Sequence, residues 1–125
     1  MEAIRAAKKG VYSAKKLAEV PPELVARYFE REGDAFILDQ SIRDEVDFVQ
    51  GDIFAQHFDK AFDFVSCRNL MIYLKREQQD QLIHHLHQQM NSGAGFVIGL
   101  TESLSPAGLK LFSTLDHFHR IFKRR

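Results

Sequence analysis

Polar side chains that can do chemistry follow directly after three apolar segments of this sequence. They supply a carboxylate, a guanidinium, a carboxamide and a phenol. In open parallel sheets the ligand binds outside the carboxyl ends of the strands, so residues at such exits line one crevice. This set of groups suits a small polar ligand that is zwitterionic or nucleoside-like. The candidate residues are Asp52, Arg68, Asn69, Tyr73 and Glu102.

A strand, a helix and a second strand are expected to position most of these groups. The segment 62–67 is nearly continuously apolar, which predicts a strand covered on both faces. Apolar residues at positions 82, 83, 86 and 90 form one stripe of a helix over 76–90. The next buried strand is predicted over 95–100. This order predicts an α/β protein with a parallel sheet, because parallel neighbours need a crossover connection of this kind.

The remaining segments have weaker patterns. A helix is predicted over 2–9, ending at Gly10, and a second helix with Pro22 in its first turn, ending by Gly33. A short strand is expected over 35–38, a turn over 41–45, and another strand over 46–49. The alternating, charged segment 117–123 predicts an antiparallel edge strand at the carboxyl terminus.

Length and composition limit the class of protein. The 125 residues suit one domain, and 17 basic and 17 acidic side chains cancel, so no long-range field favours nucleic acid. No apolar run is long enough to cross a bilayer, and no secretory signal is present. The single cysteine fits a reducing compartment. We therefore expect a cytoplasmic protein that binds no nucleic acid and is not embedded in a membrane.

Structural roles also explain the candidate residues. Arg68 and Asn69 can cap the following helix and pair with a carboxylate, and Tyr73 can be a core residue with its hydroxyl at the rim. A glutamate after a strand, such as Glu102, is usually solvated. No metal site is predicted, because the histidines at 84, 85 and 87 lack the spacing and the partners of a zinc site. Cys67 is expected to be a small buried hydrophobic residue.

Several motifs, in order along nearly the whole chain, resemble the CheR-type chemotaxis receptor methyltransferases. The segment 62–74, FDFVSCRNLMIYL, resembles the CRNxxIYF segment of that family. Residues 10–12 and 22–29 resemble its GxY…PxxLxxRYF stretch, and residues 42–48 its LRxxVxF. Residues 93–104 resemble the family's G…G[HT]SE[ST]L strand exit. The resemblance implies a Rossmann-like fold and methyl transfer from S-adenosylmethionine to glutamate side chains of receptors.

The resemblance also implies roles for single residues. Asp52, Ile53, Arg68 and Asn69 match positions that contact the cofactor, and Tyr73 matches a tyrosine that faces the methyl-transfer site. Arg68 can also pair with a carboxylate of the cofactor or of the acceptor. Asp52 departs from the asparagine common in the family. A carboxylate only accepts hydrogen bonds, so the pattern at the adenine end is expected to differ.

The family's glycine-rich loop and ribose-binding acidic residue have no counterpart in these 125 residues. We therefore expect the carboxyl-terminal half of a catalytic domain, inactive alone, in which the strand at 62–67 lacks a neighbour. Such an apolar edge predicts a homo-oligomer, domain-swapped or otherwise associated. The alternative is a noncatalytic interaction or regulatory module derived from a methyltransferase.

Overall fold

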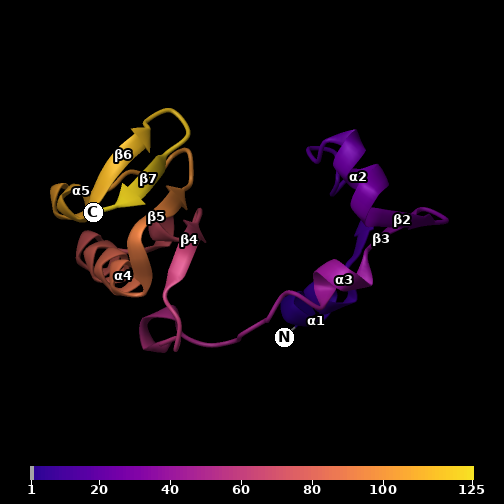
Figure 1. Ribbon diagram of the computed structural model, residues 1–125, viewed down its shortest axis with the longest axis horizontal. Helices are drawn as coiled ribbons and strands as arrows, with labels where there is room; N and C mark the ends of the chain where they lie inside the picture. The colour runs from indigo at the N-terminus through magenta and orange to yellow at the C-terminus, as the bar shows by residue number, and fades with distance from the viewer. Residues whose placement is uncertain (1) are drawn as a thin grey trace. The chain divides into compact units, whose positions relative to one another are not determined.

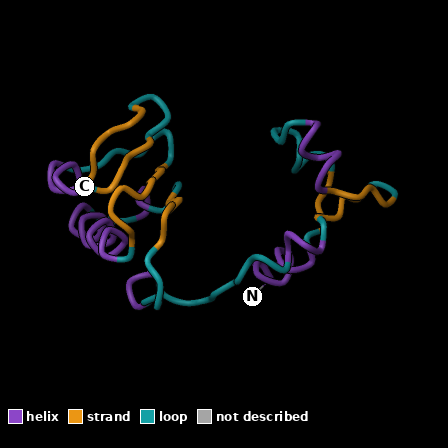
Figure 2. Tube along the Cα trace, viewed as in Figure 1, coloured by secondary structure: helices purple, strands orange, loops and turns teal. Residues whose placement is uncertain are grey.

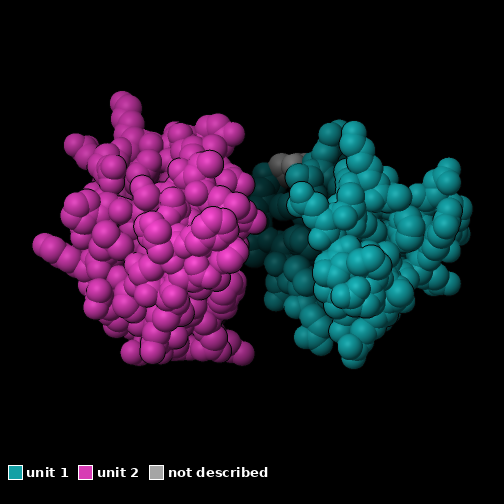
Figure 3. All heavy atoms as spheres, turned by 90° about the horizontal axis from the view of Figure 1, so that it is seen from above, with its two compact units in different colours: residues 1–51 teal, residues 52–125 magenta. Residues whose placement is uncertain are grey.

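The computed structural model describes residues 2–125. By their contacts the residues form two compact units, 1–51 and 52–125 (Figure 3). That both units belong to one domain stays a prediction. No helix in the described part of the chain is long and apolar enough to span a membrane.

The first unit is built around a small antiparallel sheet. Its strands lie in the order β1 (Val11–Ser13), β3 (Ala35–Leu38), β2 (Phe29–Glu32), and Gly33, with φ 62°, lies in the turn between β2 and β3. The predicted helix at the start is α1 (Glu2–Lys9), followed by Gly10 in the left-handed conformation. The other helices are α2 (Pro22–Tyr28) and α3 (Gln40–Arg43).

A strand that the sequence predicted in this unit is not formed. Residues 46–50 have no regular structure, where the sequence predicted a strand over 46–49 (Figure 2). A strand needs a neighbour for its backbone hydrogen bonds, and no described strand pairs with this segment. The second helix ends at Tyr28, within the predicted limit of Gly33, and Phe29 begins β2. Pairing with β3 decides the conformation there, since Phe29 lies opposite Leu38.

The second unit contains a four-stranded mixed sheet. Its order is β4 (Phe62–Cys67), β5 (Met90–Ile98), β7 (Ile121–Arg124), β6 (Phe112–Asp116), as Figure 1 shows. The pair β4 and β5 is parallel and is connected by α4 (Arg76–Gln88), which confirms the predicted strand, helix and strand. The short helices are η1 (Ile53–Ala55), η2 (Met71–Tyr73) and α5 (Pro106–Leu111).

The carboxyl-terminal strands are antiparallel, as predicted, but the order at that side of the sheet differs. β7 lies inside the sheet between β5 and β6, and β6 is the edge strand. The sequence predicted no strand over 112–116, but this segment forms a hairpin with β7 and is the edge strand of the sheet. Positions 117–120 form the turn of that hairpin, with Arg120 at φ 57°.

The hydrophobic core of the second unit lies between the sheet and α4. Leu82, Ile83 and Leu86 form the buried stripe of α4, and Phe96 stacks on Phe112 with ring centroids 4.8 Å apart. Each such side chain contributes about 1.5 to 3 kcal/mol by leaving water. This packing fixes the parallel pair of strands whose exits carry the candidate residues.

β4 is less covered than its sequence predicts. Phe62, Asp63 and Phe64 are exposed, so the expectation of a strand buried on both faces is wrong for its first half. Among the described residues β4 pairs only with β5, which leaves its other side without a strand. β4 is therefore an edge strand of the described sheet.

Candidate functional site at the exits of two parallel strands

A single carboxylate oxygen joins the exits of β4 and β5. Glu102 Oε1 accepts a hydrogen bond from the backbone N–H of Asn69, at 2.8 Å, and another from that of Gly99, at 2.7 Å. Glu102 itself lies in a turn closed by its own N–H donating to the Gly99 carbonyl. Hydrogen bonds to a charged acceptor are stronger than neutral ones. The two strand ends are therefore held together by one side chain.

Gly99 leaves room for this arrangement. A Cβ atom at position 99 would collide with Asn69 Oδ1 and lie 2.7 Å from Glu102 Oε1. Asn69 has φ 63°, the left-handed conformation that asparagine tolerates better than most residues. The carboxamide of Asn69 is therefore packed over the exit of β5 and is directed by its backbone conformation.

The second oxygen of Glu102 is buried and lacks a hydrogen-bond partner among the described residues. Only 4% of the Glu102 residue surface is exposed, which contradicts the expectation that it is solvated. Glu102 also lines a hollow of about 170 Å³ at the start of α4. The other residues lining it are Met71, Ile72, Arg76, Gln79, Thr101 and Ser103.

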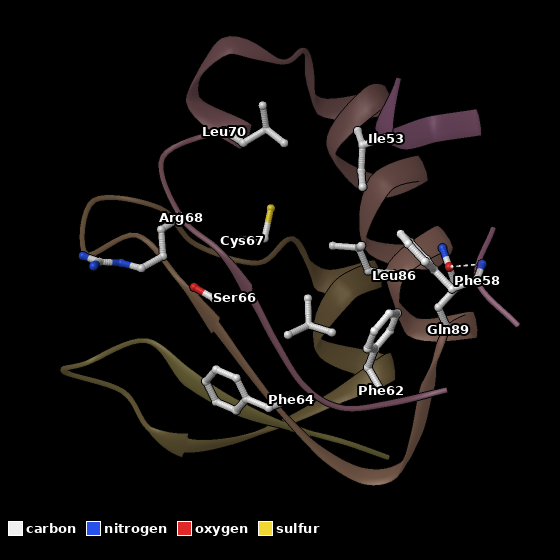
Figure 4. Close-up of a pocket in the computed structure, with 11 residues that line it drawn as sticks. Ile53, Phe58, Phe62, Phe64, Ser66, Cys67, Arg68, Leu70, Leu86 and Gln89 are labelled. Atoms are coloured by element: carbon white, nitrogen blue, oxygen red, sulfur yellow. Dashed lines mark hydrogen bonds between the residues drawn. The ribbon is translucent and has the colours of Figure 1, made fainter. Parts of the chain in front are cut away.

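A larger cavity of about 480 Å³ lies beside β4, and Figure 4 shows its lining. Its wall is mainly apolar, and the Arg68 guanidinium points away from the apolar side chains toward the margin. The N–H of Phe58 donates to Gln89 Oε1 at 3.2 Å and closes one end. The lining residues are Ile53, Phe58, Phe62, Phe64, Val65, Ser66, Cys67, Arg68, Leu70, Leu86 and Gln89.

The structure brings three of the predicted cofactor positions close to this cavity. Ile53 and Arg68 line it, and Asp52 precedes Ile53 directly. The Asp52 carboxylate caps η1 by accepting the backbone N–H of Phe54 at 3.0 Å. Asn69 follows Arg68, but its carboxamide lies over Gly99 and does not line the cavity.

Tyr73 and Arg68 lie at the surface. Tyr73 is 80% exposed at the end of η2, so the alternative that it is a core residue is wrong. It lines neither the large cavity nor the small hollow. The Arg68 guanidinium makes no hydrogen bond or ion pair with other residues that the structure describes. Both side chains are therefore available to a partner molecule.

Cys67 ends β4 with its side chain in the core. Burial raises the pKa of the Cys67 thiol to about 11, and the negative charge of Glu102 adds to the increase. A thiol with this pKa is not a nucleophile at neutral pH, which agrees with the predicted structural role. In the described part of the chain, no group of three or more histidine, cysteine or acidic side chains is placed to hold a metal ion.

Sequence reasoning missed the role of Glu102 as the link between the two strand exits. The sequence places Glu102 only among the polar groups that follow a strand. The spacing of a glycine and a glutamate three residues later, at the end of a buried strand, is the local signal. Its partner Asn69 lies 33 residues away in the sequence, so only the fold brings the two together.

The fold and the site define the class of this protein. The second unit has a parallel pair of strands joined by a crossover helix, and antiparallel strands extend the sheet at the carboxyl-terminal side. Polar groups lie at the strand exits. This arrangement is part of an S-adenosylmethionine-dependent methyltransferase fold. The family model of the CheR methyltransferase SAM-binding domain matches residues 1–119, and the chain belongs to this family.

The chain is also similar to two proteins named as chemotaxis methyltransferases and to one uncharacterised protein. A chemotaxis protein methyltransferase of Listeria monocytogenes is 27% identical over 113 residues, which cover 90% of this chain and 43% of that protein. Chemotaxis protein methyltransferase 2 of Vibrio cholerae is 28% identical over 106 residues, 82% of this chain and 37% of that protein. An uncharacterised 104.1 kDa protein of Rhodobacter capsulatus is 26% identical over 96% of this chain and 12% of its own length. The chain thus spans less than half the length of these relatives.

Proposed function

We propose that this chain forms the carboxyl-terminal part of the catalytic domain of a methyltransferase that modifies glutamate carboxylates of chemotaxis receptors. The observation that supports it most is the site at the exit of β4, where Arg68 lies free at the margin of a cavity of about 480 Å³. The family match and the relatives named as chemotaxis methyltransferases support the same reaction class. The protein is proposed to act in the cytoplasm.

The residues present fit S-adenosylmethionine as the methyl donor. The apolar wall containing Ile53 suits a flat base, and the unpaired guanidinium of Arg68 suits a carboxylate. The bound cofactor supplies the methyl group on a positively charged sulfur. Asp52 has one oxygen engaged with Phe54 N–H, so its other oxygen can accept a hydrogen bond from an amino group.

Methyl transfer to a carboxylate needs alignment more than acid or base help. Holding the acceptor oxygen in line with the reacting carbon lowers the barrier through orientation. In the proposal Asp52, Ile53, Arg68 and Asn69 bind the cofactor. Arg68 also orients a carboxylate, and the exposed phenol of Tyr73 orients the acceptor or lies against the positive charge.

Titration calorimetry with S-adenosylhomocysteine tests the cofactor site. The chain is inactive alone in this proposal, and binding near the millimolar range is expected because part of the family's contacts are not among these residues. Arg68→Ala is expected to weaken binding at least tenfold, and Asp63→Asn, an exposed change at the other end of β4, is expected to leave it unchanged. Equal binding by both variants contradicts the assigned role of Arg68.

A noncatalytic interaction module is the second candidate function. It is favoured by the exposed apolar side chains of β4, with Phe64 59% exposed beside an unpaired strand edge. An edge of this kind pairs readily with another chain. Absence of any binding heat at millimolar ligand, together with association that depends on protein concentration, supports this second function over the first.

A further inference from the structure

We propose that Glu102 is a positioning residue of the cofactor site, which holds Asn69 in the conformation that presents its carboxamide. This inference deepens the proposed function and rests on it, because Asn69 is the cofactor-binding group in that proposal. It assigns Glu102 no contact with the reacting atoms. Glu102 acts on the site through the backbone of Asn69.

Glu102 holds the backbone of Asn69 through a hydrogen bond. Its Oε1 accepts the N–H of Asn69 at 2.8 Å, so the carboxylate acts on the one residue of the β4 exit that has a left-handed backbone. A left-handed conformation costs a residue with a Cβ atom free energy and persists only when its surroundings impose it. The bond from Asn69 N–H to Oε1 is such a constraint.

Glu102 also holds the backbone of Gly99, against which the Asn69 side chain packs. The Gly99 N–H also donates to Oε1, at 2.7 Å, and the missing Cβ of Gly99 leaves the space that Asn69 Oδ1 occupies. Glu102 therefore fixes both the backbone of Asn69 and the surface against which its side chain packs. The direction of the carboxamide follows from these two contacts.

The second oxygen of Glu102, Oε2, is buried without a hydrogen-bond partner among the described residues, which makes this carboxylate costly to keep. Most buried polar groups in proteins are satisfied, and exceptions call for an explanation. Retaining a carboxylate here at that cost is explained by its strong acceptor, Oε1, which serves two N–H groups.

Amide hydrogen exchange followed by NMR tests the inference on the full 125-residue chain. Glu102→Ala is expected to accelerate exchange of the Asn69 and Gly99 amides at least tenfold and to shift the side-chain amide resonances of Asn69. Glu102→Gln replaces the charged acceptor with a weaker neutral one, so it is expected to accelerate exchange of the same two amides by a smaller factor, and it is the deciding variant should Glu102→Ala not fold.

Asp80→Asn is the matched control. Asp80 accepts a hydrogen bond from Ser105 at 2.6 Å, lies in the same unit, and takes no part in the hydrogen bonds of Glu102. A role in stability alone predicts faster exchange throughout β4 and β5 in the Glu102 and Asp80 variants alike. A positioning role predicts a change confined to Asn69 and Gly99 in the Glu102 variants.

Adding S-adenosylhomocysteine to millimolar concentration separates this inference from the function beneath it. With a working cofactor site, the ligand shifts the Asn69 resonances in the wild type and in Asp80→Asn, and the shift is lost in Glu102→Ala. No shift in the wild type refutes the cofactor role of Asn69, while the exchange result still decides whether Glu102 positions that residue. Unchanged Asn69 and Gly99 amides in Glu102→Ala overturn the inference.

Discussion

The substitution Gly99→Ala tests the link between the two strand exits most directly. The added methyl group would collide with Asn69 Oδ1 and lie 2.7 Å from Glu102 Oε1 and 3.2 Å from the backbone nitrogen of Asn69. Gly99 lacks the left-handed φ found at other glycines of the chain, so no backbone strain adds to the crowding.

The expected loss of stability is about 3 kcal/mol. Overpacking costs about 1 to 3 kcal/mol, and losing one hydrogen bond to a charged group costs about 1.5 to 3 kcal/mol. Part of this is offset, by about 0.5 to 1 kcal/mol, because alanine loses less backbone freedom than glycine on folding. Urea unfolding followed by far-ultraviolet circular dichroism measures the difference.

Gly95→Ala, in the same strand, is the control. Its Cβ would lie 2.8 Å from Phe64 Cδ2, but the ring of Phe64 is 59% exposed and can rotate away. A change of less than about 1 kcal/mol is therefore expected. Equal stability of the two alanine variants would refute the reasoning. In the Glu102→Ala background the cost of Gly99→Ala should shrink, because the two substitutions act on the same contacts.

Three further predictions concern titration and association. Burial, and then the charge of Glu102, raise the pKa of the Cys67 thiol from 9.0 to about 11. The contribution of this thiol to the free energy of unfolding is therefore complete below pH 9. It falls by about 1 to 2 kcal/mol, allowing for solvent screening, as pH rises toward 11. Cys67→Ala should abolish that decline in urea unfolding. For His87, burial and then the charge of Arg124 lower the pKa, so stability is full above pH 6.5 and is lost as pH falls through the lowered pKa. His87→Gln should reduce this loss of stability at acid pH, measured by urea unfolding. The exposed β4 edge predicts self-association in light scattering, which Phe64→Asp should reduce at least tenfold, whereas a monomeric wild type at high concentration contradicts this prediction.

Local patterns predicted those elements whose stability comes from neighbours in the sequence. The stripe of Leu82, Ile83 and Leu86 belongs to one helix face, so its period alone indicated α4. The apolar segment that became β4 is bounded by residues typical of a strand exit, and its limits were predicted correctly. The segment 46–49 has a similar local pattern, but no described strand pairs with it, and it is irregular.

Motifs and hydrophobic periods are local properties, so the family, the parallel pair of strands and the polar groups that follow them can be predicted without coordinates. The position of β7 inside the sheet, the exposure of Tyr73 and the burial of Glu102 appear only in the folded chain. These features depend on pairing and packing between residues far apart in the chain. The hydrogen bond from Asn69 to Glu102 spans 33 positions, and no pattern within either segment specifies it.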